Sequence, residues 1–242
     1  LYGGNGGYAK ASGDDVLSAT AIASSNTAEL SGQAHAEGML RGGYAFASGS
    51  ETSEVKAQAD HNMTTLSGHA DSAFYVFGGE AETRGGKTGE AIATENTVSL
   101  SGNAKVQGNA LAGNAVARGS ISNTATASRN TATLTGDAVA TRILAGGSAV
   151  AIGETGSVSE ANALENNLLM SPASVSTVDF AAGDANAVGG DSASARTERN
   201  QTTVSGGKLA FYQLLGGSAL AQLGKINEAS ANENALYVEY TQ

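Results

Sequence analysis

The sequence predicts an all-β fold, a single β-solenoid (β-helix) of about seven coils with 34–36 residues and roughly three short strands per coil. Three observations predict it: the chain repeats with that period, its strands alternate with a period of two, and its composition suits only a thin core. Of 242 residues, 33 are Gly, one is Pro, and Cys and Trp are absent. Aromatic residues make up only 5%, too few for an ordinary close-packed globular core.

The repeat is anchored on one asparagine, which returns at spacings of 36, 34, 34, 36, 34 and 34 residues. Seventeen positions after each anchor that opens a full coil stands a glycine, and nineteen positions after it an alanine. The anchors are Asn26, Asn62, Asn96, Asn130, Asn166, Asn200 and Asn234. We therefore divide the single domain 1–242 into a partial first coil 1–25, full coils 26–61, 62–95, 96–129, 130–165, 166–199 and 200–233, and a partial last coil 234–242.

Within each coil, small and polar side chains alternate. The segment 130–141 shows the pattern clearly. One face carries Ala132, Leu134, Gly136, Ala138 and Ala140, and the other carries Thr131, Thr133, Thr135, Asp137 and Val139. This alternation predicts strands with a small-residue face turned inward, because a helix would need an apolar stripe at a spacing of three to four residues. The two extra residues of the 36-residue coils are expected in a loop before the closing Ala-x-Ala pair, such as Ala57 and Ala59.

Stacked coils place equivalent residues above one another. The seven anchors are therefore expected to form a structural asparagine ladder, in which each side-chain amide donates to the neighbouring carbonyl; a binding role is the alternative. Glycines of the Gly43 type are expected to need either a positive φ or close approach of another backbone. They are Gly43, Gly79, Gly113, Gly147, Gly183 and Gly217.

One bulky stripe precedes those glycines, and we expect it to fill the widest corner of the coil. A lateral fibre contact and stacking on sugar rings are the alternatives. The stripe consists of Met39, Leu40, Phe74, Tyr75, Phe77, Leu111, Ile143, Leu144, Val178, Phe180, Tyr212, Leu214 and Leu215.

The charge and the repeat pattern of the sequence argue against several classes of function. A net charge of −10 argues against nucleic acid as a partner, and no apolar run is long enough to span a membrane. Coils of nearly equal length leave little room for a substrate cleft, so we expect neither an enzyme nor a cofactor. His61 and His69 lack further metal ligands. An outward array of Thr131, Thr133 and Thr135 is typical of ice binding, but it is broken in neighbouring coils. Surface charge is the preferred interpretation of Asp14, Asp15, Asp184 and Asp191, with loose calcium binding as the alternative.

The two ends of the sequence complement each other. The 25 residues before Asn26 and the nine from Asn234 onward together make one 34-residue unit. Open solenoid ends can add subunits head to tail, and a terminal strand can complete the next subunit's first coil. We therefore expect a homopolymer. The expected contact residues are Tyr8, Ala9, Ala11, Tyr237, Val238 and Tyr240.

In repeat style, over the whole chain, these tandem Asn/Gly/Ala/Ser units resemble bacterial functional amyloids of the curli and Fap type and the β-solenoid regions of secreted adhesins. The resemblance implies an extracellular, secreted structural subunit of a fibre, in a biofilm matrix or a cell-surface filament. Its partners would be further copies of itself and a matrix polysaccharide or cell surface. The alternatives are a rod-like adhesin segment and, less favoured, an ice-binding or carbohydrate-active β-helix.

Overall fold

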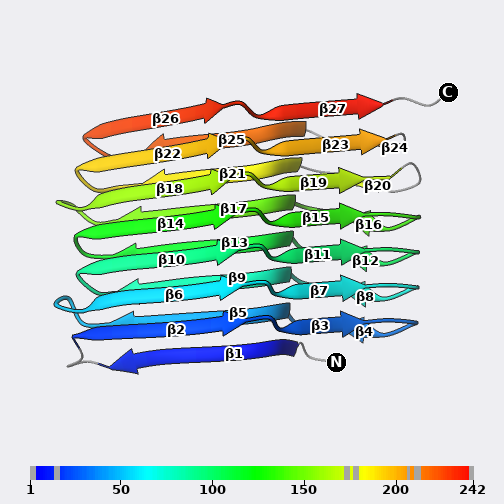
Figure 1. The fold of residues 1–242 in the computed structure, drawn as a ribbon, viewed down its shortest axis with the longest axis horizontal. Helices are drawn as coiled ribbons and strands as arrows, with labels where there is room; N and C mark the ends of the chain where they lie inside the picture. Colours follow the sequence, from blue (N-terminus) through cyan, green and yellow to red (C-terminus); the bar gives the residue numbers. More distant parts are fainter. Residues whose placement is uncertain are drawn as a thin grey trace.

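The computed structural model describes residues 4–13, 17–171, 175–176, 180–205, 208–209 and 214–239. Within them the secondary structure consists of 27 β-strands, and every strand lies parallel to its neighbours in a sheet. Figure 1 shows successive coils stacked one on another, from β1 at one end to β27 at the other. The predicted all-β solenoid is confirmed.

Four sheets run along the stack, three of seven strands and one of six. Sheet A contains β1 (Gly4–Gly13), β5 (Leu40–Gly49), β9 (Val76–Gly85), β13 (Ala110–Gly119), β17 (Leu144–Gly153), β21 (Phe180–Val188) and β25 (Leu214–Gln222). Sheet B contains β2 (Ser18–Ser24), β6 (Glu54–Asp60), β10 (Thr88–Thr94), β14 (Ser122–Ser128), β18 (Val158–Leu164), β22 (Ser192–Glu198) and β26 (Ile226–Asn232).

Sheet C contains β3 (Thr27–Leu30), β7 (Met63–Leu66), β11 (Thr97–Leu100), β15 (Thr131–Leu134), β19 (Asn167–Met170), β23 (Gln201–Ser205) and β27 (Ala235–Glu239). Sheet D contains the two-residue strands β4 (His35–Ala36), β8 (Asp71–Ser72), β12 (Lys105–Val106), β16 (Val139–Ala140), β20 (Val175–Ser176) and β24 (Lys208–Leu209). A complete coil therefore has a fourth, very short strand beyond the three that the sequence suggested.

The strand register follows the repeat, so that Ala91 pairs with Ala57 on one side and Ala125 on the other. Sheets A and B are joined by two or three residues in some coils and by four in others. The four-residue loops 50–53 and 154–157 belong to the two 36-residue coils. The predicted position of the two extra residues is thus confirmed.

Two cores fill the coil. Between sheets A and B lies an alanine core, whose members include Ala45, Ala57 and Ala91, all fully buried. Between sheets C and D and the first residues of sheet A lies a leucine core, which includes Leu100 and Leu134. Because methyl groups are the main filling of the first core, sheets A and B lie close together, as a thin core requires.

The alternation predicted for 130–141 holds with one exception. Ala132, Leu134, Ala138 and Ala140 are buried, but Gly136 is exposed in a turn with φ 66°. This turn separates sheet C from sheet D, and it interrupts what the sequence pattern presents as one continuous strand.

Candidate functional site: the asparagine ladder and the end faces

The seven anchor asparagines lie at the corner between sheets B and C. The residue before each of them has a left-handed backbone, with φ between 50° and 57°. These residues are Ser25, His61, Glu95, Arg129, Glu165, Arg199 and Glu233. Such a conformation is costly for a residue with a Cβ, and here it turns the chain sharply between the two sheets.

Each internal asparagine is joined to its neighbours along the stack. The Nδ2 of Asn96 donates to Oδ1 of Asn130 at 3.1 Å and to the backbone O of Ala59 at 2.9 Å. Its Oδ1 accepts from the backbone N and from Nδ2 of Asn62, both at 3.0 Å. The side chain of Asn96 is fully buried, and this pattern satisfies both its donors and its acceptor.

A column of glycines makes room for the ladder. A Cβ placed on Gly79 would lie 2.1 Å from Oδ1 of Asn96, and one on Gly113 would lie 2.3 Å from Cγ of Asn130. None of the Gly43-type glycines has a positive φ. Of the two reasons expected for these glycines, close approach is therefore the one that applies, and the approaching group is an asparagine amide rather than a backbone.

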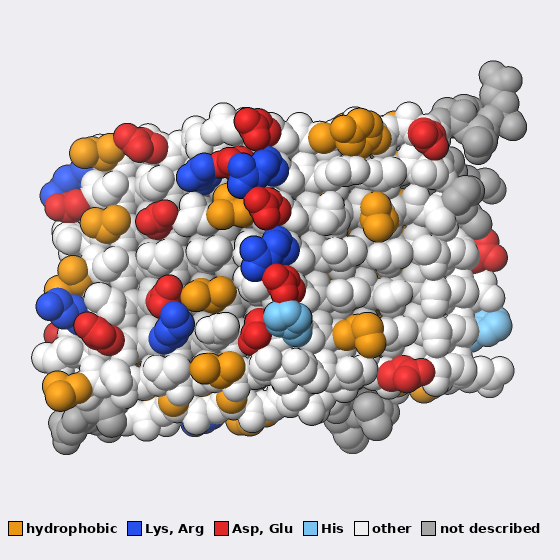
Figure 2. All heavy atoms as spheres, in the orientation of Figure 1, with side chains coloured by type: hydrophobic (Ala, Val, Ile, Leu, Met, Phe, Trp, Pro, Cys, Tyr) orange, Lys and Arg blue, Asp and Glu red, His pale blue; other side chains and the backbone are white. Residues whose placement is uncertain are grey.

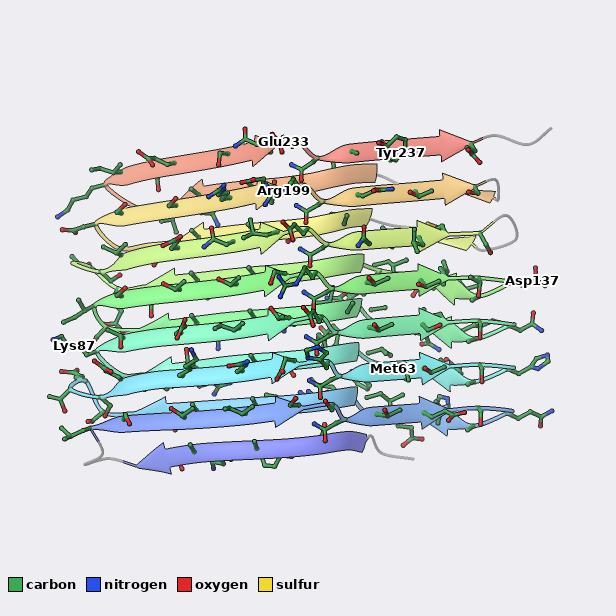
Figure 3. All side chains as sticks on the ribbon, viewed as in Figure 1. Met63, Lys87, Asp137, Arg199, Glu233 and Tyr237 are labelled. Carbon is green, nitrogen blue, oxygen red and sulfur yellow. The ribbon has the colours of Figure 1, made fainter. Side chains whose placement is uncertain are left out.

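Charged side chains alternate in sign along the same corner. Arg129 pairs with Glu95 at 2.8 Å, Arg199 pairs with Glu165 at 2.7 Å, and His61 contacts Glu95. Figure 2 shows acidic and basic groups following one another up the middle of this face, and Figure 3 places Arg199 and Glu233 on it. Because these pairs are largely exposed, each adds little to stability. Together they disfavour a shift of strand register between neighbouring coils.

The ladder has a direction. The Nδ2 of Asn26 donates to Oδ1 of Asn62, whereas within the described residues no other asparagine donates to the Oδ1 of Asn26. At the opposite end, Nδ2 of Asn234 donates to Thr197, and no further asparagine accepts from its backbone or amide within the described chain. One end face of the stack thus offers an acceptor and the other offers donors.

The end face formed by β25, β26 and β27 also exposes positions that belong to the core. Val204 and Leu168 are fully buried, but the equivalent Val238 and Leu236 of β27 are 53% and 45% exposed. Sheets A, B and C each end there on a strand with one neighbour in the described chain. A further coil would bury both side chains and pair those edges.

The other residues predicted for assembly lie near the two end faces. Tyr8 is 56% exposed on the outer side of β1 and stacks on Tyr44, whereas Ala9 and Ala11 pack against the alanine core. Tyr237 is 54% exposed on the outer side of β27 (Figure 3). Tyr240 lies outside the described residues.

The bulky stripe is divided between the core and the surface, so it only partly fills a corner. Leu40 and Leu144 enter the leucine core, and Phe77 and Leu111 form a small separate cluster with Ala145 and Tyr75. Met39, Phe74 and Ile143 are exposed. Val178, Tyr212 and the side chains of Phe180 and Leu214 lie outside the described part, and Leu215 is half-buried.

The remaining polar candidates are not brought together. His61 lies beside Asp60 and Glu95, whereas His69 contacts Asn103 at another corner. Across the described residues, no group of three or more His, Cys, Asp or Glu side chains is placed to hold a metal ion. Asp191 pairs with Lys225 at 2.9 Å, and this hydrogen bond lowers the pKa of Asp191. Asp14 and Asp15 fall outside the described residues.

The sequence analysis missed a cluster on the outer face of sheet A. There, Arg41 lies over the rings of Tyr44 and Phe77, and Arg84 lies over the ring of Phe46. Together with Arg118, these arginines pair with the nearly buried Glu80 and Glu82. The signal was available in the repeat, because register alone places Tyr44 beside Glu80 and Arg84 beside Arg118.

Comparison with known proteins returns no match to any family model, any curated protein or any solved structure. The described residues contain no helix of the length and hydropathy needed to cross a membrane.

Proposed function

We propose that the protein is a structural subunit of an extracellular fibre that grows head to tail. In this arrangement the first coil of one copy stacks on the last coil of another. The fibre would belong to a biofilm matrix or a cell-surface filament, outside the cell, as the likeness to curli- and Fap-type repeats suggests. The observation that carries the proposal is the complementarity of the two end faces of the stack.

Hydrogen bonding supports this arrangement at the ladder. In every step of the ladder, the backbone N and Nδ2 of one asparagine donate to Oδ1 of the next, at 2.8–3.1 Å. Stacking a second copy with the same register would repeat that step, from Asn234 of one copy to Asn26 of the next. The junction then needs no interaction that the coils do not already make.

Burial and strand pairing support the same register. The first coil presents β1, β2 and β3 as edges, and these would pair with β25, β26 and β27 of the other copy. Val238 and Leu236 would gain the coverage that Val204 and Leu168 already have. Such a contact is heterologous and does not close, so it generates a filament.

The proposal is tested by electron microscopy of the purified chain and of the Val238→Glu variant. The intact chain is expected to form filaments, and the variant to remain monomeric, because its carboxylate would be buried at the junction. Leu169→Glu is the matched control, since Leu169 is exposed on the outer side of β19, away from both end faces. Filaments from Val238→Glu would contradict this register, and deletion of residues 234–242 should likewise weaken assembly.

A rod-like adhesin segment is the second candidate, favoured by the aromatic cluster on sheet A. An isolated adhesin segment is expected to stay monomeric at concentrations where a fibre subunit polymerises. Monodisperse monomers of the intact chain would therefore decide for the adhesin.

A further inference from the structure

We propose that the outer face of sheet A binds an extended, neutral polysaccharide chain, across Tyr8, Tyr44 and Phe46 and into the groove beside Arg118. This inference does not depend on head-to-tail assembly, because Tyr44, Phe46 and the groove lie on the side of the stack and Tyr8 points outward from the edge strand β1. The site has three parts: an aromatic platform, a fixed polar network and a groove.

The platform consists of rings from two adjacent strands. Tyr8 of β1 stacks on Tyr44 of β5 with ring centroids 5.4 Å apart, and Tyr44 lies 6.4 Å from Phe46 on the same strand. These rings project from a sheet, and Tyr8 is more than half exposed. Adjacent rings on a sheet surface suit the flat apolar faces of sugar rings in an extended chain.

A polar network holds the platform in place. Tyr44 donates to Oε2 of Glu82 at 3.0 Å, and the guanidinium of Arg41 lies 4.5 Å from the centre of the Tyr44 ring. Burial, reinforced by Glu82, raises the pKa of Tyr44, so its hydroxyl keeps the proton that it donates. The position of the Tyr44 ring is thus fixed before any ligand arrives, which lowers the entropic cost of binding.

Every charged side chain of the network has a partner of opposite charge. Glu80 pairs with Arg41 and accepts from Nδ2 of Asn114 at 3.1 Å. Glu82 pairs with Arg84 at 2.7 Å and with Arg118 at 3.3 Å. Because each of the three guanidiniums is paired with a carboxylate, the network offers no bare positive pocket to an acidic polymer. The exposed N–H groups of Arg84 and Arg118 remain suited to sugar hydroxyls.

An open groove of about 380 Å³ continues this surface at the ends of the sheet A strands. The loops after β5 and β17, with Glu51 and Glu154, lie along it together with the tighter turns after β9 and β13. Arg118 lines the groove and also contacts Glu82, so the groove and the platform adjoin. Gly86, Gly119 and Ser120 are among its lining residues, so little side-chain bulk separates a bound chain from the backbone there.

Isothermal titration of the full chain tests this site with three soluble probes: cellohexaose, maltohexaose and an oligomer of galacturonic acid. Heat is read per chain, so the measurement works for monomers and for filaments. We expect cellohexaose, which is neutral and extended, to bind at least about tenfold more tightly than the coiled maltohexaose or the acidic oligomer.

Two variants locate the site. Tyr8→Ala and Phe46→Ala should each weaken cellohexaose binding by about tenfold, whereas Tyr237→Ala, an exposed aromatic on sheet C, should leave it unchanged. A β-type circular dichroism spectrum checks that each variant is folded. Absence of cellohexaose binding, preference for the acidic oligomer, or unchanged affinity in both platform variants would each overturn the proposal.

Discussion

Gly79 and Asn96 lie against each other so closely that the space of a missing Cβ on one is filled by the side-chain amide of the other, at 2.1 Å. The same relationship joins a glycine of sheet A to an anchor asparagine in every coil of the described chain. It links the two strongest signals of the repeat through a single contact, although they lie seventeen residues apart in the 34-residue coils and nineteen apart in the 36-residue coils.

Replacing Gly79 with alanine is therefore expected to displace Asn96 and to lower the free energy of unfolding by roughly 1–3 kcal/mol, the usual cost of overpacking. Guanidinium denaturation measures the change. Gly4→Ala is the control on the same sheet, because its Cβ would meet only Cδ2 of Leu40, at 3.9 Å. Equal stabilities for the two variants would contradict the close contact.

Removing an asparagine from the middle of the ladder should cost more than removing an exposed one. Asn96→Ala leaves the buried backbone N and Nδ2 of Asn62 without their acceptor, so we expect a loss on the order of 3 kcal/mol. Asn96→Asp should be at least as harmful, since a carboxylate cannot donate to Asn130 and Ala59. Asn103 is exposed beside His69, so the Asn103→Ala variant serves as the control, and its free energy of unfolding should be almost unchanged.

The left-handed corner predicts a difference between two substitutions at Arg129. Arg129→Gly and Arg129→Val both remove the ion pair with Glu95, but only valine is strained at φ 53°. The glycine variant should be more stable than the valine variant by about 1–2 kcal/mol in chemical denaturation. A more stable valine variant would mean that the corner does not adopt this conformation.

Asp184 is partly buried and is not the surface charge that the sequence suggested, so it predicts a pH dependence of stability. Burial raises its pKa above the ordinary 3.8, against a smaller lowering by a hydrogen bond with Ser218. The folded state therefore holds this proton more tightly than the unfolded state, and stability falls as the pH rises from about 3.8 through the folded pKa. Asp184→Asn should match the parent protein near pH 3.5 and exceed its stability at pH 8.

Asp191 predicts a change of stability with pH that is opposite in sign to that of Asp184. Its pKa is lowered by the hydrogen bond with Lys225, so that pair stabilises the fold above the ordinary pKa of 3.8 and is lost on acidification. Asp191→Asn should therefore show a small deficit at pH 8 that vanishes at low pH. Urea midpoints across the pH range measure both variants, and the same sign of effect for both would contradict the assignment.

Much of the fold was predictable because every coil of a solenoid carries the same sequence pattern for the same structural purpose. The spacing of the asparagines set the register, and the alternation of Ala with polar residues set the inward faces of sheets A and B. The loop insertions could be placed because the 36-residue coils carry four residues between their strands of sheets A and B, where the 34-residue coils carry two or three. In each case a local pattern and the global fold agree.

Other features could not be read from the pattern. The left-handed corner is occupied by Ser, His, Glu or Arg, none of which signals a positive φ as glycine does. Sheet D was missed because its strands are only two residues long and continue the alternation of sheet C. The cluster around Glu80 and Glu82 was missed because most of its contacts join residues of different coils, 34–39 positions apart in sequence.

Electron microscopy of the intact purified chain tests the central claim, head-to-tail growth through the asparagine ladder, most directly. With seven coils per copy at about 4.8 Å each, the account predicts unbranched filaments whose subunits repeat every 34 Å or so along the axis. It also predicts strands that run perpendicular to that axis and continue across each junction. Single, monodisperse particles at every concentration, or filaments in which the rods pack only side by side, would contradict it.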